Sequence, residues 1–279
     1  MSHDEIKIRP GLCVLTGQDA CGKTTQAELL RASLVKLGAK VVVSSEPSGG
    51  DIGTLIRSRL ASGDVSDPVE LALMFSADRA GHLRREVEPA IADGHVVVMT
   101  RYAESTVIYQ GLDPRMPTGG LVWAQSLQRM FRRPDICVVL GVRQDVAAGR
   151  MAWRAERDQF DSDTSLQARV AGGYGRLSGL METWNVECVS SDTSIDATAS
   201  CVLRAVVSAL CLPDPDRAAD PAAWVGRAVR LIVGQENMLG LVGHVECAMA
   251  DGTLIVRLRS GGVLHSIPRS SVELLPSGV

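Results

Sequence analysis

A glycine-rich loop between a short apolar run and a helical pattern constrains the fold of this chain more than any other feature. The stretch GQDACGKTT fits the pattern G-x-x-x-x-G-K-[ST] through Gly17, Gly22, Lys23 and Thr24. Glycines let the backbone N–H groups turn toward phosphate oxygens, and the start of the following helix adds partial positive charge. The lysine reaches the β and γ phosphates, and the threonine hydroxyl can bind Mg²⁺. The candidate nucleotide-binding residues are Gly17, Gln18, Asp19, Ala20, Cys21, Gly22, Lys23, Thr24 and Thr25.

Strand-like and helix-like segments alternate around this loop up to about residue 211. Apolar runs predict strands at 12–16, 40–45, 95–100, 135–142 and 185–191. Helical spacing predicts helices at 24–37, at 71–92 with an interruption at Pro89, and at a last segment that ends near Cys211. Repeated alternation of this kind predicts an α/β fold with a parallel sheet flanked by helices, and the glycine-rich loop makes it a P-loop fold.

The pattern changes after residue 211. The segment LPDPDRAADPAA (212–223) contains three prolines and no periodicity, which is typical of a linker. From Trp224 onward the apolar runs are short and separated by glycines and polar turns, which predicts a small antiparallel β-barrel. We therefore expect a P-loop α/β domain at 1–211, a linker at 212–223 and a small barrel module at 224–279.

Composition and charge argue against several classes of protein. The net charge of −3 over 279 residues gives no whole-chain case for nucleic-acid or membrane binding. The chain has no run of eighteen apolar residues and no apolar region in MSHDEIKIRP, so we expect neither a membrane span nor a signal peptide. Seven irregularly spaced cysteines without a C-x-x-C pair predict reduced, buried thiols in a cytoplasmic protein rather than disulfides or a zinc site.

Further segments, taken together with the loop, resemble the thymidylate kinase family. Asp19 lies where that family has an acid in the loop. The matching segments are EPSGGDIGTLIRSRL (46–60), with Glu46 and Arg57, LMFSADRAGHL (73–83), RYAESTVIYQG (101–111), the arginine-rich lid RMAWRAERDQFD (150–161) and ARVAGGY (168–174). The resemblance covers about residues 11–211 and implies that the domain at 1–211 is a P-loop kinase domain. It implies transfer of a phosphoryl group from ATP with Mg²⁺, and a homodimer.

Phosphoryl transfer requires positive charge around the transferred group, and several arginines could supply it. Lys23, Arg101 and the two lid arginines Arg154 and Arg157 come from three separate segments. A lid that closes over the phosphates would also exclude water and prevent wasteful hydrolysis.

The resemblance also implies an acceptor pocket. Phe75 would stack on the acceptor base and Arg79 would bind the edge of that base. Thr106 would read the pyrimidine, and Tyr109 would pack under the sugar and favour deoxyribose. Packing in the protein core is the alternative role for Phe75 and Tyr109.

The acceptor side departs from the family pattern, whereas the ATP side keeps it. Thr100 and Gly141 stand where the family usually has Asp, Ser45 stands where bacterial members often have Arg, and Gln159 replaces a frequent lid arginine. Three explanations follow: a thymidylate kinase with tolerated substitutions, an inactive relative, or an enzyme with a changed acceptor. The intact Lys23 and lid arginines argue against an inactive relative.

The changed acceptor is narrowly favoured from the sequence. A branch of the family in bacterial viruses phosphorylates 5-hydroxymethyluracil within DNA, and such an enzyme would work in the host cytoplasm. Its acceptor is a neutral alcohol, so an arginine that grips an acceptor phosphate could be lost at little cost. An alcohol also gains from a general base, for which Asp19 and Glu46 are candidates. The base would have to flip out of a duplex.

Other functions stay open at this point. The main alternative is a dTMP kinase that makes dTDP, and a free nucleoside or another nucleotide is a further acceptor. A nucleotide-dependent binding protein without catalysis is a different class, against which the lid arginines argue. Residues 224–275 resemble a KOW-type small barrel, a module of proteins that act on nucleic acids. Five arginines, no lysine and four acidic residues at 222–279 give this part a net charge of only +1, so DNA contact and protein contact both stay open.

Overall fold

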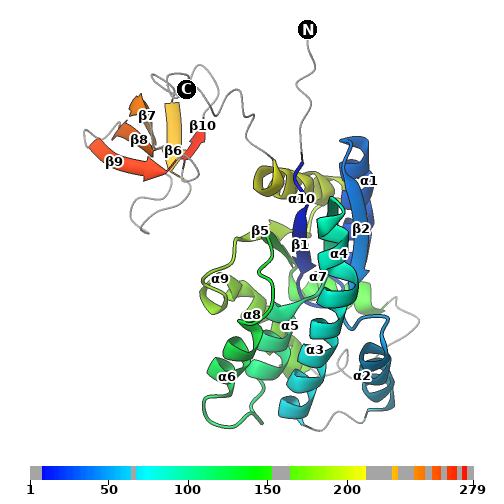
Figure 1. Cartoon of the computed structure of the whole chain (residues 1–279). Coiled ribbons are helices and arrows are strands. Elements are labelled where there is room, and N and C mark those ends of the chain that lie inside the picture. The colour runs from blue at the N-terminus through cyan, green and yellow to red at the C-terminus, as the bar shows by residue number, and fades with distance from the viewer. Residues whose placement is uncertain are drawn as a thin grey trace. The chain divides into compact units, whose positions relative to one another are not determined.

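The computed structural model of this chain describes residues 8–63, 67–152 and 164–211 and, further along, five strands between residues 228 and 274. The chain forms two compact units, Met1–Cys211 and Leu212–Val279 (Figure 1). The expected linker at 212–223 lies outside the described residues.

The first unit is built on a parallel sheet of five strands in the order β2-β3-β1-β4-β5. The strands are β1 (Gly11–Thr16), β2 (Lys40–Ser45), β3 (His95–Thr100), β4 (Ile136–Gly141) and β5 (Val186–Ser190). The predicted parallel sheet is confirmed. The central strands β1, β3 and β4 are almost wholly buried, as expected of parallel strands covered on both faces. Their carboxyl ends meet at one edge of the sheet, where ligands bind in folds of this kind.

Helices cover both faces of this sheet. They are α1 (Lys23–Lys36), α2 (Asp51–Ser62), α3 (Pro68–His82), α4 (Glu88–Ala92), α5 (Ala103–Thr106), α6 (Gly120–Gln128), α7 (Gln144–Ala152), α8 (Thr164–Gly175), α9 (Leu177–Leu180) and α10 (Ile195–Leu210), with π-helical turns at Leu83–Val87 and Val107–Gly111. Successive β1 residues point to opposite faces, so Leu12 packs with α8 and α9 whereas Cys13 packs with α1 and α10.

The expected interruption of the 71–92 helix at Pro89 is wrong. The helix begins earlier, at Pro68, where the Asp67 carboxylate accepts a hydrogen bond of 2.7 Å from the Val69 N–H. It then stays helical through Ala92. The change in winding comes before Pro89, in the π-helical turn Leu83–Val87, and the Glu88 N–H bonds to the Leu83 carbonyl. Pro89 then lies in the first turn of α4, where a missing N–H costs little.

The cysteines are only partly as expected. Cys13, Cys21 and Cys137 are buried, and burial raises the pKa of the Cys13 thiol. Cys188, Cys201 and Cys211 are exposed, which corrects the prediction of buried thiols. Cys188 lies on β5, an edge strand, and Cys201 lies on the outer side of α10. Among the described residues, no helix is both long and apolar enough to cross a membrane.

The second unit contains an antiparallel sheet in the order β10-β6-β7-β8-β9. Its strands are β6 (Ala228–Leu231), β7 (Val242–Ala248), β8 (Thr253–Leu258), β9 (Val263–Pro268) and β10 (Val272–Leu274). No pairing of β9 with β10 is found in the described strands, so closure of this sheet into a barrel stays a prediction.

Candidate active site

The glycine-rich loop leaves the carboxyl end of β1 and enters α1, as the motif predicts. Gly17 has φ 139° and Gly22 has φ 94°, a region that L side chains rarely adopt. A Cβ atom on Gly17 would lie 2.6 Å from the Leu140 carbonyl oxygen and 2.8 Å from the Cys21 sulfur. Gly22 provides no side-chain cap for α1, which leaves the N–H groups of the first helical turn oriented toward an anion.

Lys23 folds back over this loop. Its Nζ donates hydrogen bonds to the carbonyl oxygens of Gly17 (3.0 Å) and Gln18 (2.8 Å), and it lies 3.8 Å from Asp19 Oδ1. The ammonium group is thereby held at the mouth of the loop. Thr24 and Thr25 follow in the first turn of α1, where their side chains are exposed.

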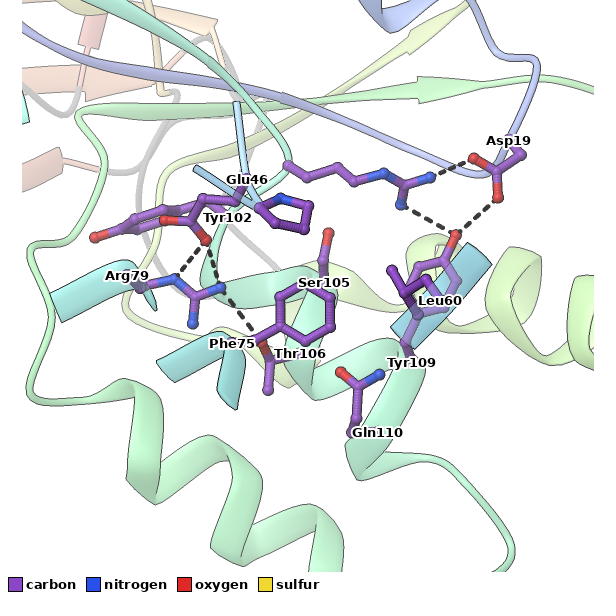
Figure 2. A pocket seen from close by; sticks show the side chains of 12 residues that line it. Asp19, Glu46, Leu60, Phe75, Arg79, Tyr102, Ser105, Thr106, Tyr109 and Gln110 are labelled. Atoms are coloured by element: carbon purple, nitrogen blue, oxygen red, sulfur yellow. Dashed lines mark hydrogen bonds and ion pairs between the residues drawn. The ribbon is translucent and has the colours of Figure 1, made fainter. Parts of the chain in front are cut away.

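A cavity of about 240 Å³ opens beside the loop. Residues from α2, α3, α5 and the segments after β2 and β3 line it (Figure 2). The structure brings together seven residues expected from the sequence: Asp19, Glu46, Phe75, Arg79, Arg101, Thr106 and Tyr109. The sequence analysis did not single out five further lining residues, Pro47, Leu60, Tyr102, Ser105 and Gln110.

A charged corner of the cavity is formed by Asp19 and Tyr109 (Figure 2) together with Arg101. Arg101 forms an ion pair with Asp19, and its Nη1 donates to the Tyr109 hydroxyl at 3.1 Å. That hydroxyl donates to Asp19 Oδ2 at 3.2 Å. Burial alone would lower the pKa of the Arg101 guanidinium, but Tyr109 and Asp19 raise it well above its usual value. Burial also raises the pKa of the Tyr109 hydroxyl, which therefore stays a proton donor.

The opposite corner is formed by Arg79 and Glu46. Their side chains are 1% and 2% exposed, and Arg79 Nη2 lies 2.6 Å from Glu46 Oε2. Arg79 Nε donates to the same oxygen at 2.9 Å, and Nη2 donates to Thr106 Oγ1 at 3.3 Å. The Tyr102 ring lies 5.2 Å from the guanidinium carbon and adds a cation–π contact. The guanidinium is therefore fixed at the cavity wall, with its charge compensated.

We next compared the sequence with known protein families and proteins. A family model described as thymidylate kinase matches residues 15–197. The chain belongs to the thymidylate kinase family. Similar proteins include a probable thymidylate kinase of Thermococcus gammatolerans, 33% identical over 195 residues, which are 66% of this chain and 89% of the relative. The thymidylate kinase of Leifsonia xyli is 37% identical over 175 residues (60% and 81%), and that of Geotalea daltonii is 30% identical over 210 residues (71% and 98%).

Membership of the thymidylate kinase family makes the chain an ATP-dependent phosphotransferase. The phosphate loop between β1 and α1, with Lys23 at the start of α1, provides the phosphate-binding site that this activity requires. Two of the expected charges cannot be placed. Arg154 and Arg157 of the lid, with Gln159, lie outside the described residues.

Arg150 is a residue that the sequence analysis did not assign to the site. It lies on α7 and donates from Nη1 to the Ala20 carbonyl (3.2 Å) and from Nη2 to the Ser191 carbonyl (2.8 Å). It thereby ties the phosphate loop to the segment after β5. Arg150 begins the arginine-rich segment 150–157, and this position could have identified it as a site residue from the sequence.

Ser45 at the end of β2 and Thr100 at the end of β3, where the resemblance led us to expect Arg and Asp, are neighbours. Ser45 pairs with Thr100 in the parallel register, and the Glu46 N–H donates to the Thr100 carbonyl at 3.3 Å. Both side chains are neutral. A carboxylate that the sequence analysis missed lies nearby: Glu104 is fully buried and accepts from Thr16 Oγ1 at 2.6 Å. The sequence alone could not single out Glu104, because an acidic residue three positions after Arg101 is common on helices.

Proposed function

We propose that this chain is a dTMP kinase, which transfers the γ-phosphoryl group of ATP to dTMP and forms dTDP and ADP. The observation that carries the proposal is the cavity, which holds Arg79 and Thr106 at one corner and Arg101 beside the phosphate loop at the other. Relatives with about one third identity are named thymidylate kinases, which favours dTMP over the DNA acceptor that the sequence alone had favoured.

The Arg79 corner suits a thymine base. Thymine presents an acceptor at O4, whereas cytosine presents an amino donor at the same position. Arg79 is a donor only, so it would bind the O4 edge and reject the cytosine amino group. Phe75, in the cavity lining, would stack on the base, and Tyr109 would lie under the deoxyribose.

The Arg101 corner suits the reacting phosphates. Lys23 and Arg101 would stabilise the charge on the phosphoryl oxygens, and Arg154 and Arg157 are further candidates for this role by the family resemblance. Thr24 provides one hydroxyl ligand for Mg²⁺, which supplies charge neutralisation when bound with ATP. The described residues contain no group of three or more metal-ligating side chains.

Phosphorylation of 5-hydroxymethyluracil within DNA is the second candidate. The neutral pair Ser45 and Thr100 favours it, because neither residue could grip or organise an acceptor phosphate. The C-terminal sheet would then contact the DNA. Both candidate bases are already engaged, however, since Asp19 is paired with Arg101 and Glu46 with Arg79.

We also propose that the enzyme forms a homodimer, as the family resemblance implies. Exposed apolar side chains occur on α2 (Ile52, Leu55), α3 (Leu73) and α6 (Val122, Trp123), and α3 contacts both other helices (Figure 1). Burial of these side chains between two copies would stabilise a dimer. Analytical ultracentrifugation should give twice the monomer mass, and a monomer at micromolar concentration would contradict this proposal.

Lys23→Ala tests the proposed reaction. Removal of the ammonium group should reduce dTDP formation at least about a hundredfold, because it removes the side chain that reaches the transferred phosphate. The measurement is the steady-state rate of ADP and dTDP production with the wild type in parallel. A Lys23→Ala variant with full activity would exclude this loop from the reaction.

A further inference from the structure

Arg79 is held by more than its ion pair with Glu46. Glu46 occupies the Nε and Nη2 side of the guanidinium, and Nη2 also reaches Thr106 in the cavity lining. The remaining nitrogen, Nη1, donates at 2.5 Å to Oε1 of Gln128, the last residue of α6. Gln128 does not line the cavity and is 3% exposed, so it contacts the arginine from the protein interior.

The orientation of the Gln128 amide follows from its other partner. Ser76 Oγ donates to the Ala72 carbonyl at 2.6 Å, so its single proton is used. Ser76 Oγ can then only accept, and it accepts from Gln128 Nε2 at 3.2 Å. The amide oxygen must therefore face Arg79, which has donors alone. The hydrogen bonds that link Arg79, Gln128, Ser76 and Ala72 therefore fix which amide atom of Gln128 faces Arg79.

The same end of α6 also supplies an aromatic contact. The Phe131 ring lies 5.5 Å from the Arg79 guanidinium carbon, three residues after Gln128. A buried guanidinium group whose Nη1 lost its acceptor would leave an unsatisfied N–H in the interior. It would lower this cost by turning toward another acceptor, which would move Nη2 away from Thr106 and from the cavity.

We propose that Gln128 is a specificity-determining, positioning residue for the acceptor base. By fixing Nη1 from behind, it keeps Nη2 on the Thr106 hydroxyl in the cavity lining, and this Arg79–Thr106 pair selects a pyrimidine with a carbonyl acceptor at position 4. This inference rests on the proposed dTMP kinase function. Gln128 acts through Arg79 and does not touch the substrate.

Three variants test the role of Gln128. Gln128→Leu keeps the bulk of the side chain and removes the acceptor, and Gln128→Glu keeps an oxygen at the same reach. Gln125→Leu is the matched control, because Gln125 lies on the same helix but donates to the Leu180 carbonyl. KM and kcat are measured for dTMP, and calorimetry compares the binding of thymidine and deoxycytidine.

Gln128→Leu should raise the KM for dTMP about tenfold or more, with a smaller change in kcat, and should reduce the preference for thymidine over deoxycytidine by a similar factor. Gln128→Glu should recover part of the affinity, because one carboxylate oxygen still accepts from Nη1 while the other faces a hydroxyl that only accepts. Gln125→Leu should leave the affinity unchanged. A Gln128→Leu variant that melts like Gln125→Leu and binds thymidine as the wild type does would overturn the inference.

Two further results separate this inference from the proposed function. A wild-type enzyme that does not phosphorylate dTMP would contradict the dTMP kinase proposal, while the calorimetric preference for thymidine would still test Gln128. Ser76→Ala removes the partner that orients the Gln128 amide. If Gln128→Leu does not fold, Ser76→Ala should still weaken thymidine binding, and unchanged binding would overturn the inference.

Discussion

Thr100, at the carboxyl end of β3, stands where the sequence analysis expects an Asp in the family. Its side chain is half-buried and neutral, and it lies beside Arg101. Thr100→Asp would add a carboxylate, which is a better Mg²⁺ ligand than a hydroxyl. We predict a higher rate of dTMP phosphorylation at limiting Mg²⁺. The measurement is the rate of dTDP formation across a Mg²⁺ titration, and identical titration curves would make the substitution incidental.

Individual site residues could be predicted only where a motif fixes their spacing. Lys23 follows from the loop pattern, and Asp19, Arg79 and Tyr109 follow from the resemblance to the family. Gln128 could not be predicted, because its partner Arg79 is 49 residues away and glutamine is common on helix surfaces. Long-range contacts of this kind leave no local pattern.

The phosphate loop is the element that most depends on backbone conformation. Gly17→Ala would place a Cβ atom against the Leu140 carbonyl at a φ that alanine adopts only with strain. We predict destabilisation by about 1–3 kcal/mol together with loss of ATP binding. The control is Gly172→Ala on α8, where an added Cβ meets nothing within 4 Å.

Thermal unfolding and equilibrium ATP binding test the Gly17 prediction. The Gly172 variant should melt at or above the wild-type temperature, because alanine favours a helix interior over glycine. Wild-type ATP affinity in Gly17→Ala would show that the loop tolerates a side chain and would contradict the strain expected at this position.

Strands were more predictable than helices in this chain. Buried parallel strands are continuous apolar runs bounded by glycine or polar residues, and all five expected runs correspond to β1–β5. The start of α3 was missed by three residues because Asp67 and Pro68 form a cap rather than an apolar repeat. The π-helical turn at Leu83–Val87 depends on a backbone bond that side-chain periodicity does not report.

At the scale of the whole molecule, the cavity and the phosphate loop lie within Met1–Cys211. A chain that ends at Cys211 should therefore fold and phosphorylate dTMP with kcat/KM within about threefold of the full chain. The truncated chain must retain Leu210 and Cys211, because the Leu210 carbonyl accepts a hydrogen bond of 2.9 Å from the Arg9 N–H. A folded but inactive truncated chain would assign the C-terminal unit a part in catalysis.

The two candidate functions differ in the molecule that accepts the phosphoryl group. Transfer of labelled γ-phosphate from ATP identifies this acceptor directly. The full-length enzyme is incubated in parallel with dTMP and with DNA that contains 5-hydroxymethyluracil, and thymine-containing DNA serves as control. A dTMP kinase should place label in dTDP and none in either DNA. Label in the modified DNA alone would contradict the proposed function and would explain the neutral pair Ser45 and Thr100.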